Sequence, residues 1–147
     1  MAKELIGKSV VLRECEPALL PQIPHDAEGD LFDPHVGQVD SPTYFSIYSE
    51  GVFDSMFVGD CVIYNPEHGE VEFGIKIIKE FRGMGYGSEA TRIITDYCFT
   101  TMGYSKVHLK VLPYNLRAIR SYEKAGFKRC GKIVIDGVEF IKMEKTK

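Results

Sequence analysis

The chain has 147 residues, of which 44% are hydrophobic and 27% are charged, and its formal net charge is −3. This size suits a single domain with its own core, and the composition excludes a disordered or fibrous protein. No run approaches the roughly 20 apolar residues that cross a bilayer, and the N-terminal residues lack the apolar core of a leader peptide. We therefore expect one domain over residues 1–147, located in the cytoplasm, with neither a membrane nor a nucleic acid as partner.

The charge is distributed unevenly along the chain. Residues 1–75 carry three basic and 14 acidic side chains, whereas residues 76–147 carry 15 basic and seven acidic ones. A basic half suits a polyanionic cofactor and an acidic half suits a cationic second substrate, although the two halves could equally pair with each other. The four cysteines are far apart and form no Cys-x-x-Cys pair, which favours reduced thiols over disulfides.

The first half of the chain predicts mainly β-structure. Residues 9–14 are expected to form a first strand, and the proline- and glycine-rich interval 16–40 leaves room for little more than one short helix. Three β-rich segments follow at 43–49, 56–64 and 70–78, separated by turn residues. Their short connections predict a consecutive antiparallel meander.

The second half predicts a helix, a strand, a second helix and a hairpin. Apolar residues recur at helical spacing over 86–102 and stop at Gly103, whereas alternation over 106–112 indicates a strand. Asn115 is a suitable N-cap for a helix through Ala125. The expected hairpin strands, 132–135 and 138–143, flank Asp136-Gly137. The predicted class is α+β, with helices against a mixed sheet.

A glycine-rich turn joins the strand at 70–78 to the helix at 86–102. Gly83, Gly85 and Gly87 let several backbone N–H groups converge next to a helix N-terminus, which predicts a site for a phosphate-bearing ligand. A kinase-type P-loop is excluded because the required lysine is missing. The pattern Gly85-x-Gly87-x-x-Ala90 also matches a dinucleotide-binding fingerprint, but no alternating βαβ pattern surrounds it. A purely structural loop is the remaining alternative.

Two segments carry a resemblance to a known family. The Arg-x-x-Gly-x-Gly pattern at 82–87 resembles motif A of the GNAT (Gcn5-related) N-acetyltransferases. Residues 115–127 look like motif B, particularly in the branch similar to ribosomal-protein alanine acetyltransferases. Over about residues 70–130 the resemblance implies the GNAT fold, a mixed, mostly antiparallel sheet flanked by helices. The family's helical segment after the first strand, here about 16–42, is reduced, so the acceptor cleft is either open or completed by a second subunit of a homodimer.

The resemblance also implies acetyl-CoA as the cofactor and assigns residues to it. Strand residues Ile75, Lys76 and Ile77 are expected to pair with the pantetheine arm, and Asn115 is expected to contact the cofactor. Lys124, Lys128 and Arg129 are candidates for the adenosine phosphates, although each could be a solvated surface side chain. The residues expected around the pyrophosphate are Arg82, Gly83, Met84, Gly85, Tyr86, Gly87 and Ser88.

The implied reaction is direct acetyl transfer to a primary amine, such as a peptide N-terminus, a polyamine or an aminoglycoside. Glu72 is the candidate base, because it alternates with apolar neighbours and so lies on the opposite strand face; a solvent-facing glutamate is the alternative. Tyr122 matches the family's general acid, and a core tyrosine is its alternative. Substitute bases are Glu50, Asp60 and Glu70.

Other residues are expected to have no catalytic role. No metal is expected, because the loop histidines and aspartates lack a recognised ligand spacing. His108 is expected to be packed or hydrated, and Cys98 and Cys130 are expected to pack in the core. The excluded metal candidates are His25, Asp26, Asp33 and His35. Two other functions stay open: an acyl-CoA-binding module without catalysis, and another kind of nucleotide- or phosphate-binding protein.

Overall fold

The computed structural model describes residues 3–16, 19, 21, 42–50, 55–67 and 70–147. The predicted helix-poor interval at 16–42 therefore lies almost entirely outside the described residues. The elements in chain order are β1 (Glu4–Ile6), β2 (Val10–Cys15), β3 (Thr43–Glu50), β4 (Ser55–Glu67), β5 (Glu70–Ile77), the 3-10 turn η2 (Lys79–Phe81), α1 (Tyr86–Thr100), β6 (Lys106–Val111), α2 (Leu116–Lys124), β7 (Lys128–Ile135) and β8 (Val138–Thr146).

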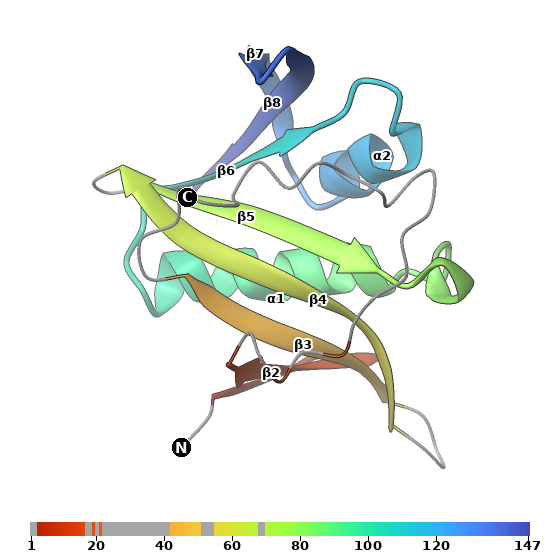
Figure 1. The fold of residues 1–147 in the computed structure, drawn as a ribbon. Helices are drawn as coiled ribbons and strands as arrows, with labels where there is room; N and C mark the ends of the chain where they lie inside the picture. The colour runs from red at the N-terminus through yellow and green to blue at the C-terminus, as the bar shows by residue number, and fades with distance from the viewer. Residues whose placement is uncertain (1–2, 17–18, 20, 22–41, 51–54, 68–69) are drawn as a thin grey trace.

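The described strands form one mixed sheet in the order β1-β2-β3-β4-β5-β6-β8-β7 (Figure 1). Strands β3, β4 and β5 form the predicted antiparallel meander, and β2 extends it by pairing antiparallel with β3. β6 lies between β5 and β8 and runs parallel to β5, whereas the other neighbouring strands are antiparallel. The α+β prediction with a mixed, mostly antiparallel sheet is therefore confirmed.

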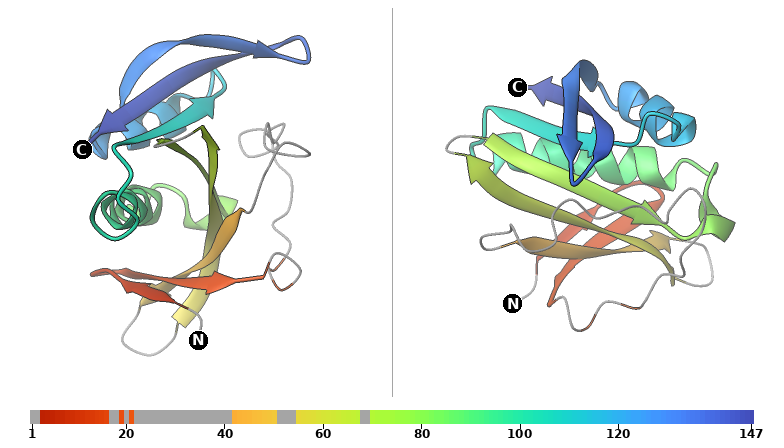
Figure 2. Two further views of the ribbon diagram at one scale, coloured as in Figure 1. Left: turned by 90° about the vertical axis from the view of Figure 1, so that its left-hand side faces the viewer. Right: turned by 45° about the horizontal axis from the view of Figure 1, so that its top comes forward.

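The sheet curves around α1, with the first strands at one end and the β7–β8 hairpin at the other (Figure 2). Alternation directs Val71 and Phe73 of β5, and Val107 of β6, into the same apolar core as Ile94 of α1. The residues between them on β5 and β6 lie on the opposite face of the sheet. The apolar side chains of these two strands thus pack in the core on one face of the sheet, and polar side chains can occupy the other face.

The buried face of α1 differs in part from the predicted apolar stripe. Thr91 and Thr95 are fully buried, and their hydroxyls donate to the Gly87 and Thr91 carbonyls at 2.7 and 2.9 Å. These bonds satisfy the two hydroxyls within the helix and make the threonines acceptable in the core. The helix ends at Thr100, so Met102 lies beyond it and is 38% exposed.

Strand β1 was not predicted, because its three residues show too little alternation. Its connection to β2 is held by a distant side chain, Glu89 of α1. Oxygen Oε2 of Glu89 accepts hydrogen bonds of 2.9 Å from the backbone amides of Ser9 and Val10. Glu89, in the first turn of α1, therefore fixes the β1–β2 connection at the edge of the sheet and does not cap its own helix.

Candidate active site

β5 and β6 are paired over only three residues of each strand, Glu70–Glu72 and Lys106–His108. Beyond that point the two strands diverge, and α2 lies near the open end of the gap (Figure 1). A cavity of about 540 Å³ occupies this gap, and β5, β6, the glycine-rich turn and α2 all line it. The volume is in the range of small-molecule sites, which is about 300–1,000 Å³.

The glycine-rich turn forms one end of the cavity. Gly83 and Gly85 have φ angles of 78° and 86°, in the left-handed region that favours glycine. Gly85 is the N-cap of α1, and no side chain caps the helix, so its first backbone N–H groups lack the usual acceptor. A Cβ added at either glycine would meet nothing within 4 Å. The turn therefore presents amide donors and the positive end of the helix dipole beside open space.

Most of the residues predicted to bind the cofactor line this cavity. They include the strand residues Ile75, Lys76 and Ile77, and Arg82, Gly83, Gly85, Gly87, Ser88 and Asn115. Met84 and Tyr86 are not among the lining residues; Met84 is 58% exposed, and Tyr86 packs near Phe81. Asn115 is the N-cap of α2, where its Oδ1 accepts a hydrogen bond of 3.3 Å from the amide of Ala118.

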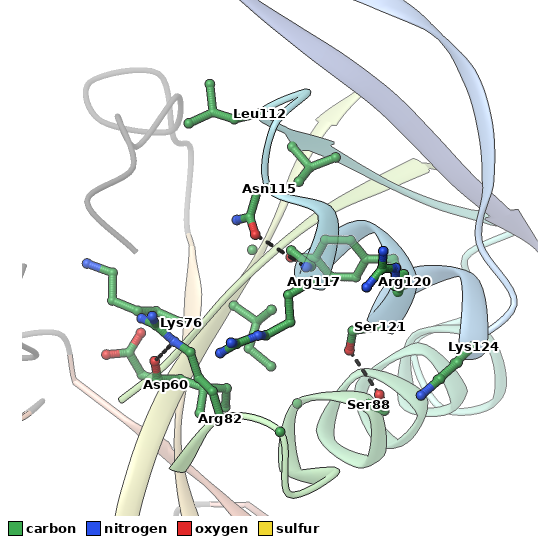
Figure 3. Close-up of a pocket in the computed structure, with 18 of the residues that line it drawn as sticks. Asp60, Lys76, Arg82, Ser88, Leu112, Asn115, Arg117, Arg120, Ser121 and Lys124 are labelled. Atoms are coloured by element: carbon green, nitrogen blue, oxygen red, sulfur yellow. Dashed lines mark hydrogen bonds between the residues drawn. The ribbon is translucent and has the colours of Figure 1, made fainter. Parts of the chain in front are cut away.

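Basic side chains dominate the charged lining. Figure 3 shows Arg117, Arg120 and Lys124 projecting from α2, whereas Arg82 of the glycine-rich turn lies beside Asp60. Of the three predicted phosphate contacts only Lys124 lines the cavity; Lys128 and Arg129 lie on β7 instead. The spacing of positions 117, 120 and 124 matches one helix face, and this pattern could have identified the two arginines from the sequence.

Tyr122 of α2 lines the cavity and is also part of the core. It is 7% exposed, and its ring lies edge-on to Phe127 with centroids 6.1 Å apart. Burial raises the pKa of its hydroxyl above the ordinary value. The phenol therefore keeps its proton at neutral pH and can only donate it there. The two predicted interpretations, a core residue and an acid, are thus compatible.

Glu72 is buried on the sheet face opposite α1, with 1% of its surface exposed. Lys110 of β6 binds it with Nζ at 2.8 and 3.0 Å from the two carboxylate oxygens, and the hydroxyl of Tyr64 donates to Oε2. Lys110 lines the cavity, whereas Glu72 lies behind it. Glu72 is therefore neither solvent-facing nor directly on the cavity wall, and Lys110 connects it to that wall.

The remaining candidates are distributed around this region. Asp60 lines the cavity, whereas Glu50 is exposed at the end of β3. Cys98 packs in the core as expected, and burial raises the pKa of its thiol to about 12. Cys130 is exposed on β7, so the expectation that it packs in the core is wrong. Within the described part of the chain no cluster of metal-ligating side chains occurs, and no helix is long and apolar enough to span a bilayer. The four excluded metal candidates lie outside the described residues.

Comparison with protein families identifies the chain. The family model described as "Acetyltransferase (GNAT) domain" matches residues 19–128. This chain belongs to the GNAT acetyltransferase family. The fold and the family predicted from the sequence are thereby confirmed.

Among curated GNAT relatives, the spermidine N(1)-acetyltransferase of Escherichia coli K12 is 31% identical over 105 residues, which are 71% of this chain and 55% of the relative. A kanamycin resistance protein of Rhizobium radiobacter is 35% identical over 65 residues, which are 44% of this chain and 60% of that protein. The chain thus spans little more than half the length of these relatives.

Solved structures agree on the fold. The aminoglycoside acetyltransferase AAC(6')-Ib, in complex with paromomycin and acetyl-CoA, has a TM-score of 0.62 and 24% identity over 73% of this chain and 66% of that one. Mycobacterium smegmatis RimJ, in complex with CoA-disulfide, has a TM-score of 0.63 and 23% identity over 71% of this chain and 53% of that one. At these identities the likeness shows the shared GNAT fold alone.

The buried ion pair of this GNAT chain leads to a stability prediction. Replacing Lys110 by Met should lower the free energy of unfolding by about 3 kcal/mol, because it leaves the Glu72 carboxylate buried without its cation. The double variant Glu72→Gln, Lys110→Met should recover most of that loss. Urea denaturation measures both, and Lys142→Met, which alters the residue paired with Lys110 on β8, is the matched control. Equal losses in the single and double variants would contradict the prediction.

Proposed function

We propose that this chain is an acetyl-CoA-dependent N-acetyltransferase that acts on a primary amine. The observation that carries the proposal is the gap between β5 and β6, with free amide donors at the start of α1 and basic side chains around it. Membership in the GNAT family and relatives named for spermidine and kanamycin support the same activity.

The chemistry of the cavity lining suits acetyl-CoA. The amides of the glycine-rich turn and the guanidinium of Arg82 would hold the pyrophosphate. Arg117, Arg120 and Lys124 would neutralise the adenosine phosphates. The backbone of Ile75–Ile77 has no sheet partner on the side of β6 and would bind the pantetheine arm as an added strand does. Bound acetyl-CoA supplies an activated acyl group, and the chain supplies its orientation.

Two side chains would transfer protons during the reaction, one as an acid and one as a base. An acceptor that enters as an ammonium ion must lose a proton before its nitrogen can attack the thioester, and the leaving thiolate gains one. Tyr122 would donate its phenolic proton to the sulfur, since its raised pKa keeps it protonated. Glu72 would take the proton of the amine through Lys110, which contacts both the carboxylate and the cavity.

One observation favours a second candidate, a GNAT-fold module that binds acyl-CoA without catalysis. The carboxylate of Glu72 is held in an ion pair behind the cavity wall rather than exposed on it. Release of CoA should be measured with spermidine, kanamycin and a peptide with an N-terminal alanine. Turnover of any of these amines supports the enzyme. Thermal stabilisation by acetyl-CoA without turnover supports the module, and stabilisation by ATP or NAD but not by CoA would overturn both.

The role of the glycine-rich turn can be tested with a matched pair of variants. Gly85→Ala and Gly103→Ala each place a methyl group at a positive φ, 86° and 78°, where nothing lies within 4 Å. Both should therefore lose about 1 kcal/mol of stability from backbone strain. Only Gly85→Ala should weaken acetyl-CoA binding, by at least about tenfold, because only this methyl group lies on the cavity wall. Calorimetric titration measures the affinity; equal affinities for the two variants would argue against the turn as a phosphate site.

The role of Tyr122 can be tested by removing its hydroxyl alone. Tyr122→Phe should lower kcat by about 10²-fold, because the thiolate then leaves without a proton donor. The KM for acetyl-CoA should change little, and stability should be kept because the ring still packs against Phe127. Tyr97→Phe is the control, since Tyr97 also has a pKa raised by burial but does not line the cavity. A Tyr122→Phe enzyme with full kcat would remove the acid role.

A further inference from the structure

Polar side chains form a row across the sheet face opposite α1. Tyr64 of β4, Glu72 of β5, His108 of β6 and Glu144 of β8 are direct partners in register on neighbouring strands. The row starts at the closed end of the gap between β5 and β6, where those two strands are still paired. Glu72 is its most buried member, and the row leads from there towards the outer strands.

His108 is the member of this row whose bonding is incomplete. Its side chain is 13% exposed, and both ring nitrogens are buried without a hydrogen-bond partner among the residues that the structure describes. Nδ1 lies 3.4 Å from Oε1 of Glu72, and Nε2 lies 3.7 Å from Oε2 of Glu70. Buried polar atoms without partners are rare in folded proteins and require a reason. Here each nitrogen faces a carboxylate at a separation that a small movement converts into a hydrogen bond.

A buried base needs a way to lose its proton. Acetyl transfer from acetyl-CoA to an ammonium ion yields the amide, the free thiol of CoA and one proton for each turnover. Tyr64 and Lys110 already donate hydrogen bonds to Glu72. His108 is the neighbour with a nitrogen that can accept. Glu70, on its other side, is 30% exposed and so reaches solvent.

We propose that His108 carries the proton of Glu72 to Glu70 and hence to water; this inference rests on the proposed function. The O–H bond of protonated Glu72 breaks as the Nδ1–H bond of His108 forms. The resulting imidazolium releases its Nε2 proton to Glu70, which passes it to water. Rotation of the ring and exchange with water restore the starting tautomer. His108 thus acts through Glu72 and without contact with the acceptor.

Carboxylates and lysines both surround the imidazolium that the relay forms on His108. Glu70 and Glu72 of β5 flank the ring, and Glu144 of β8 is its direct partner in register. Lys106 and Lys110 of the same strand oppose the positive charge. Each of these lysines is held by carboxylates, however: Lys106 by Glu70 and Glu144 at 3.7 and 3.3 Å, and Lys110 by Glu72.

The test compares His108→Gln and Glu70→Gln with wild type, using acetyl-CoA and whichever of spermidine, kanamycin or the alanine peptide is turned over. Both variants should lower kcat at pH 7 about tenfold in dilute buffer, with the KM for acetyl-CoA within twofold. Added imidazole should restore most of the rate of both variants, because it takes up the proton that the interrupted path no longer carries to water. The deficit should vanish as the pH rises past the pKa of the acceptor amine, since a neutral amine brings no proton to remove.

Glu139→Gln is the control, since it removes a carboxylate of the same strand β8 that pairs with Lys132 and lies outside the row. It should keep the wild-type rate and show no dependence on imidazole. A kcat deficit in His108→Gln that is independent of pH and not rescued by imidazole would overturn the relay, as would an unchanged kcat. If His108→Gln proves unfolded by circular dichroism, Glu70→Gln carries the same prediction. Wild type without turnover on any amine would instead overturn the proposed function, and the relay with it.

Discussion

Three residues of pairing hold β5 and β6 together, and the divergence beyond them creates the cavity. A parallel pair that continued would consume the backbone groups of Ile75–Ile77 and leave no gap. Instead α2 lies near the open end, where Ile119 and Tyr122 join the core that α1 and the sheet already share. Apolar burial therefore stabilises the open arrangement, and the edge of β5 stays available for a ligand.

The glycine-rich turn works because it combines two local features. A helix start leaves amide donors without acceptors, and a glycine N-cap supplies no side chain to satisfy them. The donors lie beside open space, where an anion can bind them and interact favourably with the positive end of the helix dipole. The arginines and the lysine of α2 add charge at the same place, and their exposure to solvent keeps the cost of placing them there small.

On the opposite face of the sheet the chain buries charges. Glu72 is nearly inaccessible, and hydrogen bonds from Lys110 and Tyr64 compensate for its desolvation. Such a site is expensive to maintain for packing alone, because an apolar side chain would fill the same space. Its position behind the cavity-lining Lys110 is the observation on which its proposed role as a base rests.

The sequence by itself determined the meander, both helices, the N-cap at Asn115 and the glycine turn, because propensity, alternation and turn chemistry act over a few neighbouring residues. It also placed Glu72 on the face opposite the core. Only the tertiary structure decided that Lys110, 38 positions further along the chain, binds that carboxylate, and that Glu89 secures β1. The tertiary structure likewise placed β6 between β5 and β8. These outcomes depend on which strands become neighbours and in what register, and that choice is made by packing the whole core rather than by any local pattern.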